Sequence, residues 1–230
     1  MSDWLQFLNR KIGTALMLDQ GECNGSCPDA CVLLSALLSG IAAELWPGEG
    51  FDRRRFVELW VRFADPKLVP SLISVPLLRR SFRDAGRLAD VTALEEARRE
   101  MFGLGNGCLV LVGDRVDMTE AELLTVLPKA DRKEFRVYSY PSLFYKHIRS
   151  NLVHEYKLSE DAASHFATRL QANVSYVNRA DPAGMELSRR LIHFHIEWLA
   201  NIVRSIASNV APLIENYQTL PQPPNWWVSG

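Results

Sequence analysis

The residues best suited to chemistry in this chain lie in the run RSNLVHEY, which begins at Arg149. Arginine carries a permanent, fork-shaped positive charge that suits a phosphate, and histidine is the side chain whose proton moves most easily near neutral pH. Cleavage of a phosphodiester bond without a metal requires these two kinds of group. The run therefore predicts a catalytic pair, Arg149 and His154, with Ser150, Asn151 and His147 in supporting roles.

A helical wheel places these side chains relative to one another. At about 100° per residue, four polar side chains share one face and the apolar side chains lie opposite. Arg149 falls about 140° from His154, beside the apolar stripe, so it must extend around the helix or serve a neighbouring subunit. The structural alternative is an arginine that reaches from the edge of the core to a carboxylate. The polar face holds His147, Ser150, Asn151 and His154, and the apolar face holds Tyr145, Ile148, Leu152 and Tyr156.

The same spacing of arginine and histidine recurs where two adjacent arginines precede His195. We predict a helix here from about Met185 to Tyr217, and His195 falls inside its apolar arc. This indicates a hydrogen-bonded histidine of the core. His193 lies on the other side of the same helix, which predicts a surface pair with Glu197 and excludes chelation of one metal by the two histidines.

The cysteines are few and do not form a standard metal motif. Cys23, Cys27 and Cys31 are spaced four apart, and Cys108 lies far along the chain. Pro28 lies inside the run, so a regular helix cannot present all three thiols on one face. We predict free, reduced thiols, with Cys31 in a core, and neither a metal nor a cofactor. A structural zinc or redox cluster is the alternative.

Composition limits the class of protein. A chain of 230 residues that is 47% hydrophobic can bury one large core, and a net charge of −1 argues against strong non-specific binding to nucleic acid. The N-terminus lacks a basic flank and an apolar run, and no uninterrupted apolar stretch approaches 18 residues, so we expect a cytoplasmic protein with no membrane span. No nucleophile elbow, zincin or P-loop motif is present, which argues against the enzyme classes that use them.

The pattern along the chain is mostly helical, which predicts an all-α fold in a single domain over 1–230. Cap signals predict helices that begin near Asp3, Ser26 and Asp52, and a capping box at Thr119 and Glu122 predicts a short one. Prolines interrupt the region 66–140, which we interpret as an irregular insertion with at most a short β-hairpin. Other expected elements are helices over 77–84 and 93–102, a strand over 109–112, an extended segment over 135–140, and a proline- and tryptophan-rich tail over 220–230.

The segment that begins at Arg149 resembles the Arg-x4-6-His motif of the HEPN (higher eukaryotes and prokaryotes nucleotide-binding) superfamily. The resemblance depends on Arg149, Ser150, Asn151 and His154. Three other features fit that resemblance: the predicted motif helix begins at Pro141, the chain is mostly helical, and the predicted C-terminal helix is long. It implies a helical bundle that forms homodimers and places two motifs in one cleft. It further implies metal-independent endoribonuclease activity on single-stranded RNA, with Arg149 and His154 as the catalytic residues.

A second interpretation stays open on the same residues. Some members of that superfamily bind only nucleotides or partner proteins, and Arg149 and His154 would then have structural roles. The alternative prediction is therefore a non-catalytic helical module for nucleotide binding or for protein interaction through dimerisation.

Overall fold

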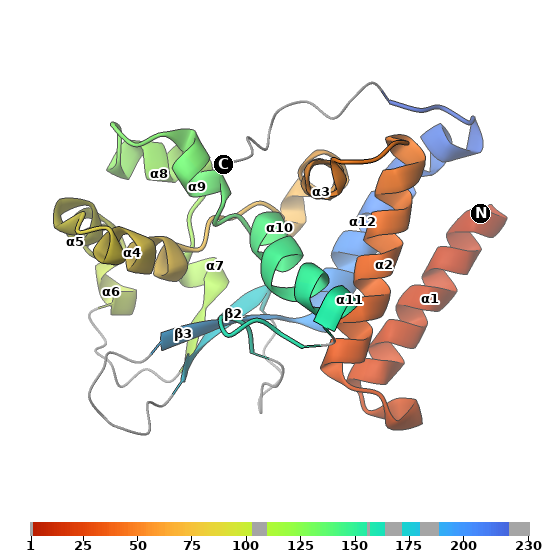
Figure 1. The fold of residues 1–230 in the computed structure, drawn as a ribbon, viewed down its shortest axis with the longest axis horizontal. Coiled ribbons are helices and arrows are strands. Elements are labelled where there is room, and N and C mark those ends of the chain that lie inside the picture. Colours follow the sequence, from red (N-terminus) through yellow and green to blue (C-terminus); the bar gives the residue numbers. More distant parts are fainter. Residues whose placement is uncertain (1, 103–109, 156, 164–171, 180–188, 221–230) are drawn as a thin grey trace.

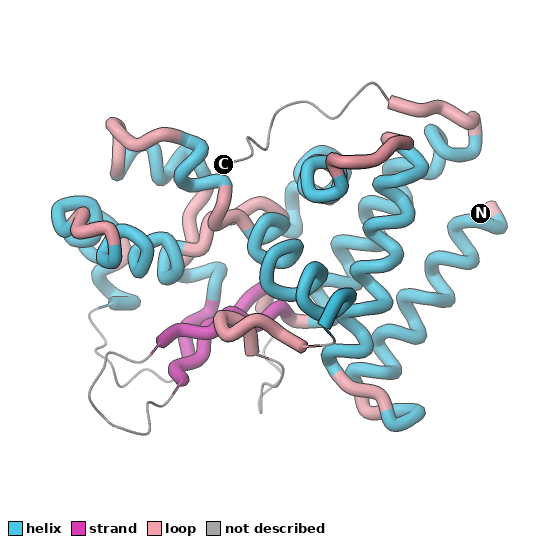
Figure 2. The backbone as a smooth tube through the Cα atoms, in the orientation of Figure 1, coloured by secondary structure: helices cyan, strands magenta, loops and turns pink. Residues whose placement is uncertain are grey.

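A computed structural model describes residues 2–102, 110–155, 157–163, 172–179 and 189–220. Most of this chain is helical, as predicted, and a small antiparallel sheet lies between two groups of helices (Figures 1 and 2). In the larger group, three long helices run side by side (Figure 1). They are α1 (Asp3–Asp19), α2 (Cys27–Leu45) and α12 (Ile196–Glu215), and α3 (Asp52–Phe63) packs across α2 and α12.

The ends of these helices follow local signals. The Ser2 side chain caps α1 by accepting a hydrogen bond from the Leu5 amide at 3.3 Å, one residue before the predicted cap. Ser26 occupies the N-cap position of α2 and a proline lies in its first turn, as the sequence predicted. Asp52 is the first residue of α3, and Phe51, not Asp52, occupies its N-cap position.

The main core lies where the apolar faces of α2, α3 and α12 meet. Aromatic rings fill its centre: Trp60 lies 5.5 Å from Phe144 and 5.8 Å from Trp198, and Phe144 lies 5.2 Å from Phe194. By length and composition α2 is also apolar enough to cross a membrane. Four of the apolar side chains of α2, Leu34, Leu38, Ile41 and Leu45, pack in the core.

A second hydrophobic cluster lies within the region predicted as an insertion. It is formed by α4 (Val75–Asp84), α5 (Leu88–Ala97), α8 (Glu120–Val126) and α9 (Arg132–Arg136), with Ile73 and Phe135 completely buried. Ion pairs lie on the surface of this cluster. Three short helices lie in the connections of this region: η2 (Pro66–Leu68), α6 (Arg99–Phe102) and α7 (Gly113–Val116). Another short helix, η1 (Glu22–Asn24), joins α1 to α2.

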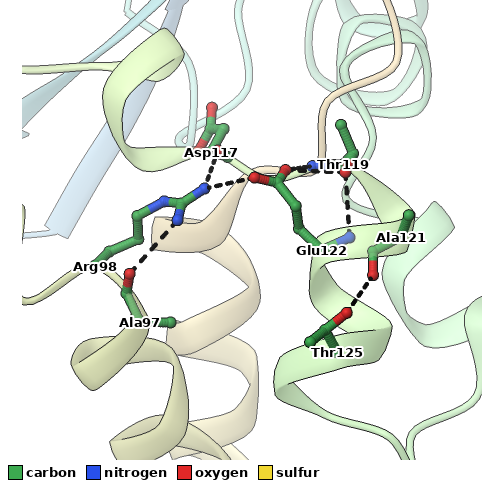
Figure 3. Close-up of polar contacts among 7 residues, drawn as sticks. All are labelled: Ala97, Arg98, Asp117, Thr119, Ala121, Glu122 and Thr125. Atoms are coloured by element: carbon green, nitrogen blue, oxygen red, sulfur yellow. Dashed lines mark hydrogen bonds and ion pairs between the residues drawn. The ribbon is translucent and has the colours of Figure 1, made fainter.

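Figure 3 shows the contacts that tie this cluster together. The predicted capping box is present, because the Glu122 amide donates to Thr119 Oγ1 at 3.2 Å and Glu122 Oε2 accepts from the Thr119 amide at 2.7 Å. Arg98 donates to the Asp117 carbonyl at 3.2 Å and to Glu122 Oε1 at 3.4 Å. These bonds connect the end of α5, the start of α8 and the segment that carries Asp117.

The sheet has three strands in the order β1-β2-β3: β1 (Val110–Val112), β2 (Val174–Arg179) and β3 (Arg189–Phe194). β1 confirms the predicted strand, but β3 contradicts the helix predicted from Met185 to Tyr217. The apolar spacing of that segment suits either element, and pairing with β2, in which Ser175 lies opposite His193, favours the strand. The helix α12 begins only at Ile196.

The extended segment predicted over 135–140 is also wrong. The helix α9 ends at Arg136, a turn follows, and α10 (Tyr140–Leu143) begins. Ser139 and Ser142 Oγ both lie 2.8 Å from the Arg136 carbonyl and stabilise this turn, a local alternative to a strand. The predicted glycine-rich turn at 103–107 and the residues 221–230 of the tail lie outside the described residues.

Candidate functional site

The predicted motif spans two kinds of helix. After α10 the chain forms a π-helical segment, η3 (Phe144–Arg149), and then α11 (Ser150–Glu155). A π-helix bonds each amide to the carbonyl five residues back, and such segments are frequent at functional sites. The wider turn changes which side chains share a face, so a wheel at 100° per residue does not hold across Arg149.

Arg149 is half-buried, and its closest described partner is Tyr145, four residues earlier. The guanidinium carbon lies 5.0 Å from the centre of the Tyr145 ring, and Nη1 donates to the Tyr145 hydroxyl at 3.4 Å. Within the described part of the chain Nε has no hydrogen-bond partner, and the guanidinium pairs with no carboxylate. The carboxylate that the structural alternative requires is therefore missing among these residues.

His154 lies one turn further along, on α11, and is exposed, while Ser150 and Asn151 are half-buried. No hydrogen bond joins Arg149 to His154 in the residues that the structure describes. The two predicted catalytic side chains thus lie on neighbouring turns and share no hydrogen bond among the described residues.

His147 does not share the open polar face. It is buried, at 5% exposure, and its Nδ1 lies 2.7 Å from Ser159 Oγ. The supporting role predicted for His147 on that face is therefore wrong in its geometry. The wider π-helical turn rotates His147 inward, where the Ser159 hydroxyl provides a partner.

His195 is buried and hydrogen-bonded, as predicted, but at the N-cap of α12 instead of inside a helix. Its Nε2 lies 2.8 Å from Ser175 Oγ. Burial, and then the charge of His193, lower the pKa of His195 to about 4. His193 is buried as well, and the two rings pack edge to face at 4.9 Å. The predicted surface pair of His193 with Glu197 is wrong because His193 lies in β3 and is buried, with Nδ1 3.1 Å from the Ala163 carbonyl oxygen.

The cysteines follow the prediction as far as they are described. Cys23, Cys27 and Cys31 are free thiols, and Cys31 is buried. A hydrogen bond that the Cys31 thiol donates to Cys27, followed by burial, raises the pKa of Cys31 well above its usual value. Among the described residues no group of three potential ligands is arranged to hold a metal. Cys108 lies outside them.

Sequence reasoning missed two groups beside the motif. Tyr145 was assigned to the apolar stripe, although its spacing of four from Arg149 is a signal for contact on a helix. Arg53, at the start of α3, is half-buried near Tyr145. Burial lowers the pKa of Arg53, and the proximity of Tyr145 raises it. No local pattern connects Arg53 to the motif, because α3 and η3 are far apart in sequence.

It also missed a buried network around Asp117. One carboxylate oxygen, Oδ2, accepts hydrogen bonds from the hydroxyls of Tyr140 and Tyr176, each at 2.6 Å, and Oδ1 accepts from the Val75 amide at 3.0 Å. Since Tyr176 has only one hydroxyl proton, Ser74 Oγ, 2.8 Å away, must donate to it. Complete burial raises the pKa of Asp117 to about 7, against the lowering effect of these bonds.

This network joins three parts of the fold. Asp117 follows α7, Tyr140 begins α10, and Tyr176 lies in β2. A side chain at Gly113 would collide with the Tyr140 hydroxyl and come within 3.0 Å of Asp117 Oδ2, so the close approach requires glycine. The network fixes the start of the helical segment that leads to Arg149.

Comparison of this chain with protein-family models, with curated proteins and with solved structures finds no match. The functional argument therefore depends on the site itself.

Proposed function

We propose that this protein is a metal-independent endoribonuclease that cleaves single-stranded RNA with Arg149 and His154. The observation that carries the proposal is the state of Arg149, a half-buried guanidinium with no carboxylate partner in the described chain. Arginines with structural roles are paired here: Arg79 with Glu95, and Arg136 with Glu120. A semi-buried cation without a counter-charge is suited to an anionic ligand.

In the proposed reaction His154 removes the proton of a ribose 2′-hydroxyl, and the resulting oxygen attacks the adjacent phosphorus. The bond to the 5′-oxygen breaks, that oxygen takes up a proton from solvent, to which His154 returns the proton that it removed, and a 2′,3′-cyclic phosphate remains. Arg149 stabilises the negative charge that develops on the phosphorus oxygens. Neither group requires a metal for these steps.

A homodimer resolves the separation of the two side chains. His154 is exposed and the Arg149 guanidinium bonds to Tyr145, so the two side chains share no hydrogen bond within the described part of one chain. A twofold arrangement of two motifs would place His154 of the partner subunit opposite Arg149. In this arrangement each cleft uses both chains.

The test is cleavage of single-stranded RNA by the purified full chain in excess chelator. We expect His154→Ala to lower the rate by about 10²-fold or more with an unchanged circular dichroism spectrum, and an all-2′-deoxy oligonucleotide to stay intact. A mixture of Arg149→Gln and His154→Ala chains should recover part of the activity if the cleft is shared.

Two outcomes contradict the proposal. Intact RNA under all conditions, with a stable dimer, favours the non-catalytic nucleotide-binding or protein-interaction module. Cleavage that survives His154→Ala but disappears in a well-folded His195→Ala variant would place the reaction at the second Arg/His spacing instead.

A further inference from the structure

Two thiols lie together at the start of α2. Cys27 is the first residue of this helix and Cys31 follows four residues later, so their β-carbons lie about 5 to 6 Å apart on one face. The Cys31 thiol donates a hydrogen bond to the Cys27 side chain. The helix spacing and the hydrogen bond therefore bring the two sulfur atoms together at the end of α2 that is joined to α1 through η1 (Figure 1).

The two thiols differ in their access to solvent. Cys31 packs in the main core with 4% of its surface exposed, whereas Cys27 is half-buried. A small, uncharged oxidant therefore reaches the Cys27 sulfur first. The hydrogen bond from Cys31 supports negative charge on that sulfur, and the thiolate is the form that attacks an oxidant. Cys27 is thus placed as an attacking thiol and Cys31 as the thiol that resolves the product.

A disulfide between these residues fits the backbone after one local movement. Four residues of α-helix separate two α-carbons by about 6 Å, within the range of about 4.4 to 6.8 Å that disulfides span. The β-carbons must approach each other by about 1 to 2 Å to reach the separation that a disulfide requires. Closure therefore requires the first turn of α2 to open.

The first turn of α2 is weakly capped, which allows this opening. Within the described chain the Ser26 side chain caps no amide and donates instead to Asp29 Oδ2 at 2.5 Å. Pro28, in the same turn, has no amide hydrogen to contribute. Opening the turn breaks the bond of 3.1 Å from the Ala30 amide to the Ser26 carbonyl. The apolar side chains further along α2 can stay in the core.

We propose that Cys27 and Cys31 form a dithiol that hydrogen peroxide oxidises reversibly to a disulfide. First the Cys27 sulfur attacks a peroxide oxygen and the O–O bond breaks. Cys27 becomes a sulfenic acid, and the released hydroxide takes up the former thiol proton as water. The Cys31 sulfur then attacks the Cys27 sulfur, the S–O bond breaks, and the departing hydroxide takes the Cys31 proton as a second water.

In this reaction the peroxide gains the two electrons that the two thiols lose. Glutathione reverses it by thiol–disulfide exchange, through a mixed disulfide. The inference is independent of the proposed ribonuclease, because that reaction uses neither thiol.

The experiment treats the reduced full-length protein with hydrogen peroxide and counts free thiols after denaturation. The chain has four cysteines and one disulfide consumes two, so the count should fall from four to two. Excess glutathione should restore it to four. Mass spectrometry of the unreduced protein should show the loss of two hydrogens within one chain.

Three variants test the identity of the pair. Cys23→Ser removes the exposed neighbour in η1, and the disulfide should form at a rate within about twofold of the wild type. Cys31→Ala should stop the reaction at a sulfenic acid on Cys27, which dimedone captures. Cys27→Ala should leave the buried Cys31 thiol without its partner, and Cys31 should be oxidised at least about 10-fold more slowly.

Circular dichroism checks that each variant is folded. Should Cys31→Ala fail to fold, Cys27→Ala against Cys23→Ser still decides. A disulfide that requires Cys23 or joins two chains would overturn the assignment. Oxidation of Cys31 as fast in Cys27→Ala as in the wild type would do the same, as would sulfinic acids that appear without any disulfide.

Discussion

Two clusters in this protein pair tyrosines with an ionisable side chain, and they differ in how completely they are satisfied. Around Asp117, two tyrosine hydroxyls and an amide donate to one completely buried carboxylate. Around Tyr145, a half-buried arginine has one long hydrogen bond and a nitrogen without a partner in the described chain. A saturated, dry network holds elements together, whereas an unsaturated one at the surface retains capacity for a ligand.

The largest effect should follow from removing the buried carboxylate. Asp117→Ala leaves the hydroxyls of Tyr140 and Tyr176 and the Val75 amide without an acceptor, so we expect a loss of about 3 to 5 kcal/mol in the free energy of unfolding. Arg149→Gln should cost less than about 1 kcal/mol, because no buried partner among the described residues depends on it. Urea denaturation measures both. Equal losses of unfolding free energy in the two variants would contradict the contrast between a saturated cluster at Asp117 and an unsaturated one at Tyr145.

The pH dependence of stability should identify Asp117. Its pKa of about 7 in the folded protein exceeds the value of about 4 for an unfolded aspartate, so folding takes up a proton between these values. The stability that this group contributes is complete below about pH 4 and is lost as the pH rises through about 7. Asp117→Asn does not titrate, so its melting temperature should fall by several degrees less than that of the wild type between about pH 5 and pH 8. Parallel melting curves across this range would contradict the prediction.

A single methyl group should disturb the saturated cluster. Gly113→Ala places a carbon against the Tyr140 hydroxyl and the Val174 carbonyl, and we expect a loss of about 1 to 3 kcal/mol. Gly40→Ala is the control, since no atom lies within 4 Å of the added carbon and the position is in a helix, where alanine is favoured. Thermal melting should separate the two variants in opposite directions. A Gly113→Ala protein as stable as the wild type would mean that the network has room.

The smallest effect concerns His195, a third buried polar group. Its pKa of about 4 in the folded protein lies below the value of about 6.5 for an unfolded histidine. The stability that it contributes is present above about pH 6.5 and is lost as the pH falls through about 4, opposite in sign to Asp117. His195→Gln should therefore flatten the acid side of the stability profile by an amount smaller than the Asp117 effect. If the stability of the His195→Gln variant falls toward acid pH as steeply as that of the wild type, another group controls this pH dependence.

Prediction from sequence succeeded where a few neighbouring residues decide the structure. The start of α2 at Ser26 and the capping box at Thr119 are local, because a cap joins residues only three apart. The helix predicted through Arg189–Phe194 failed because its apolar spacing fits two elements and the choice depends on β2. The wheel around Arg149 failed at His147, where the π-helical turn replaced the assumed periodicity.

The sequence by itself determined the helical class, the starts of several helices and the presence of an arginine and a histidine on adjacent turns, since these depend on residue types and short spacings. Only the tertiary structure decided that Tyr145 packs against Phe56 of α3, that His195 bonds to Ser175 of β2, and that Asp117 is buried among two tyrosines. Such pairings join segments far apart in the chain. Burial and long-range packing, which set their pKa values and their partners, leave no local pattern in the sequence.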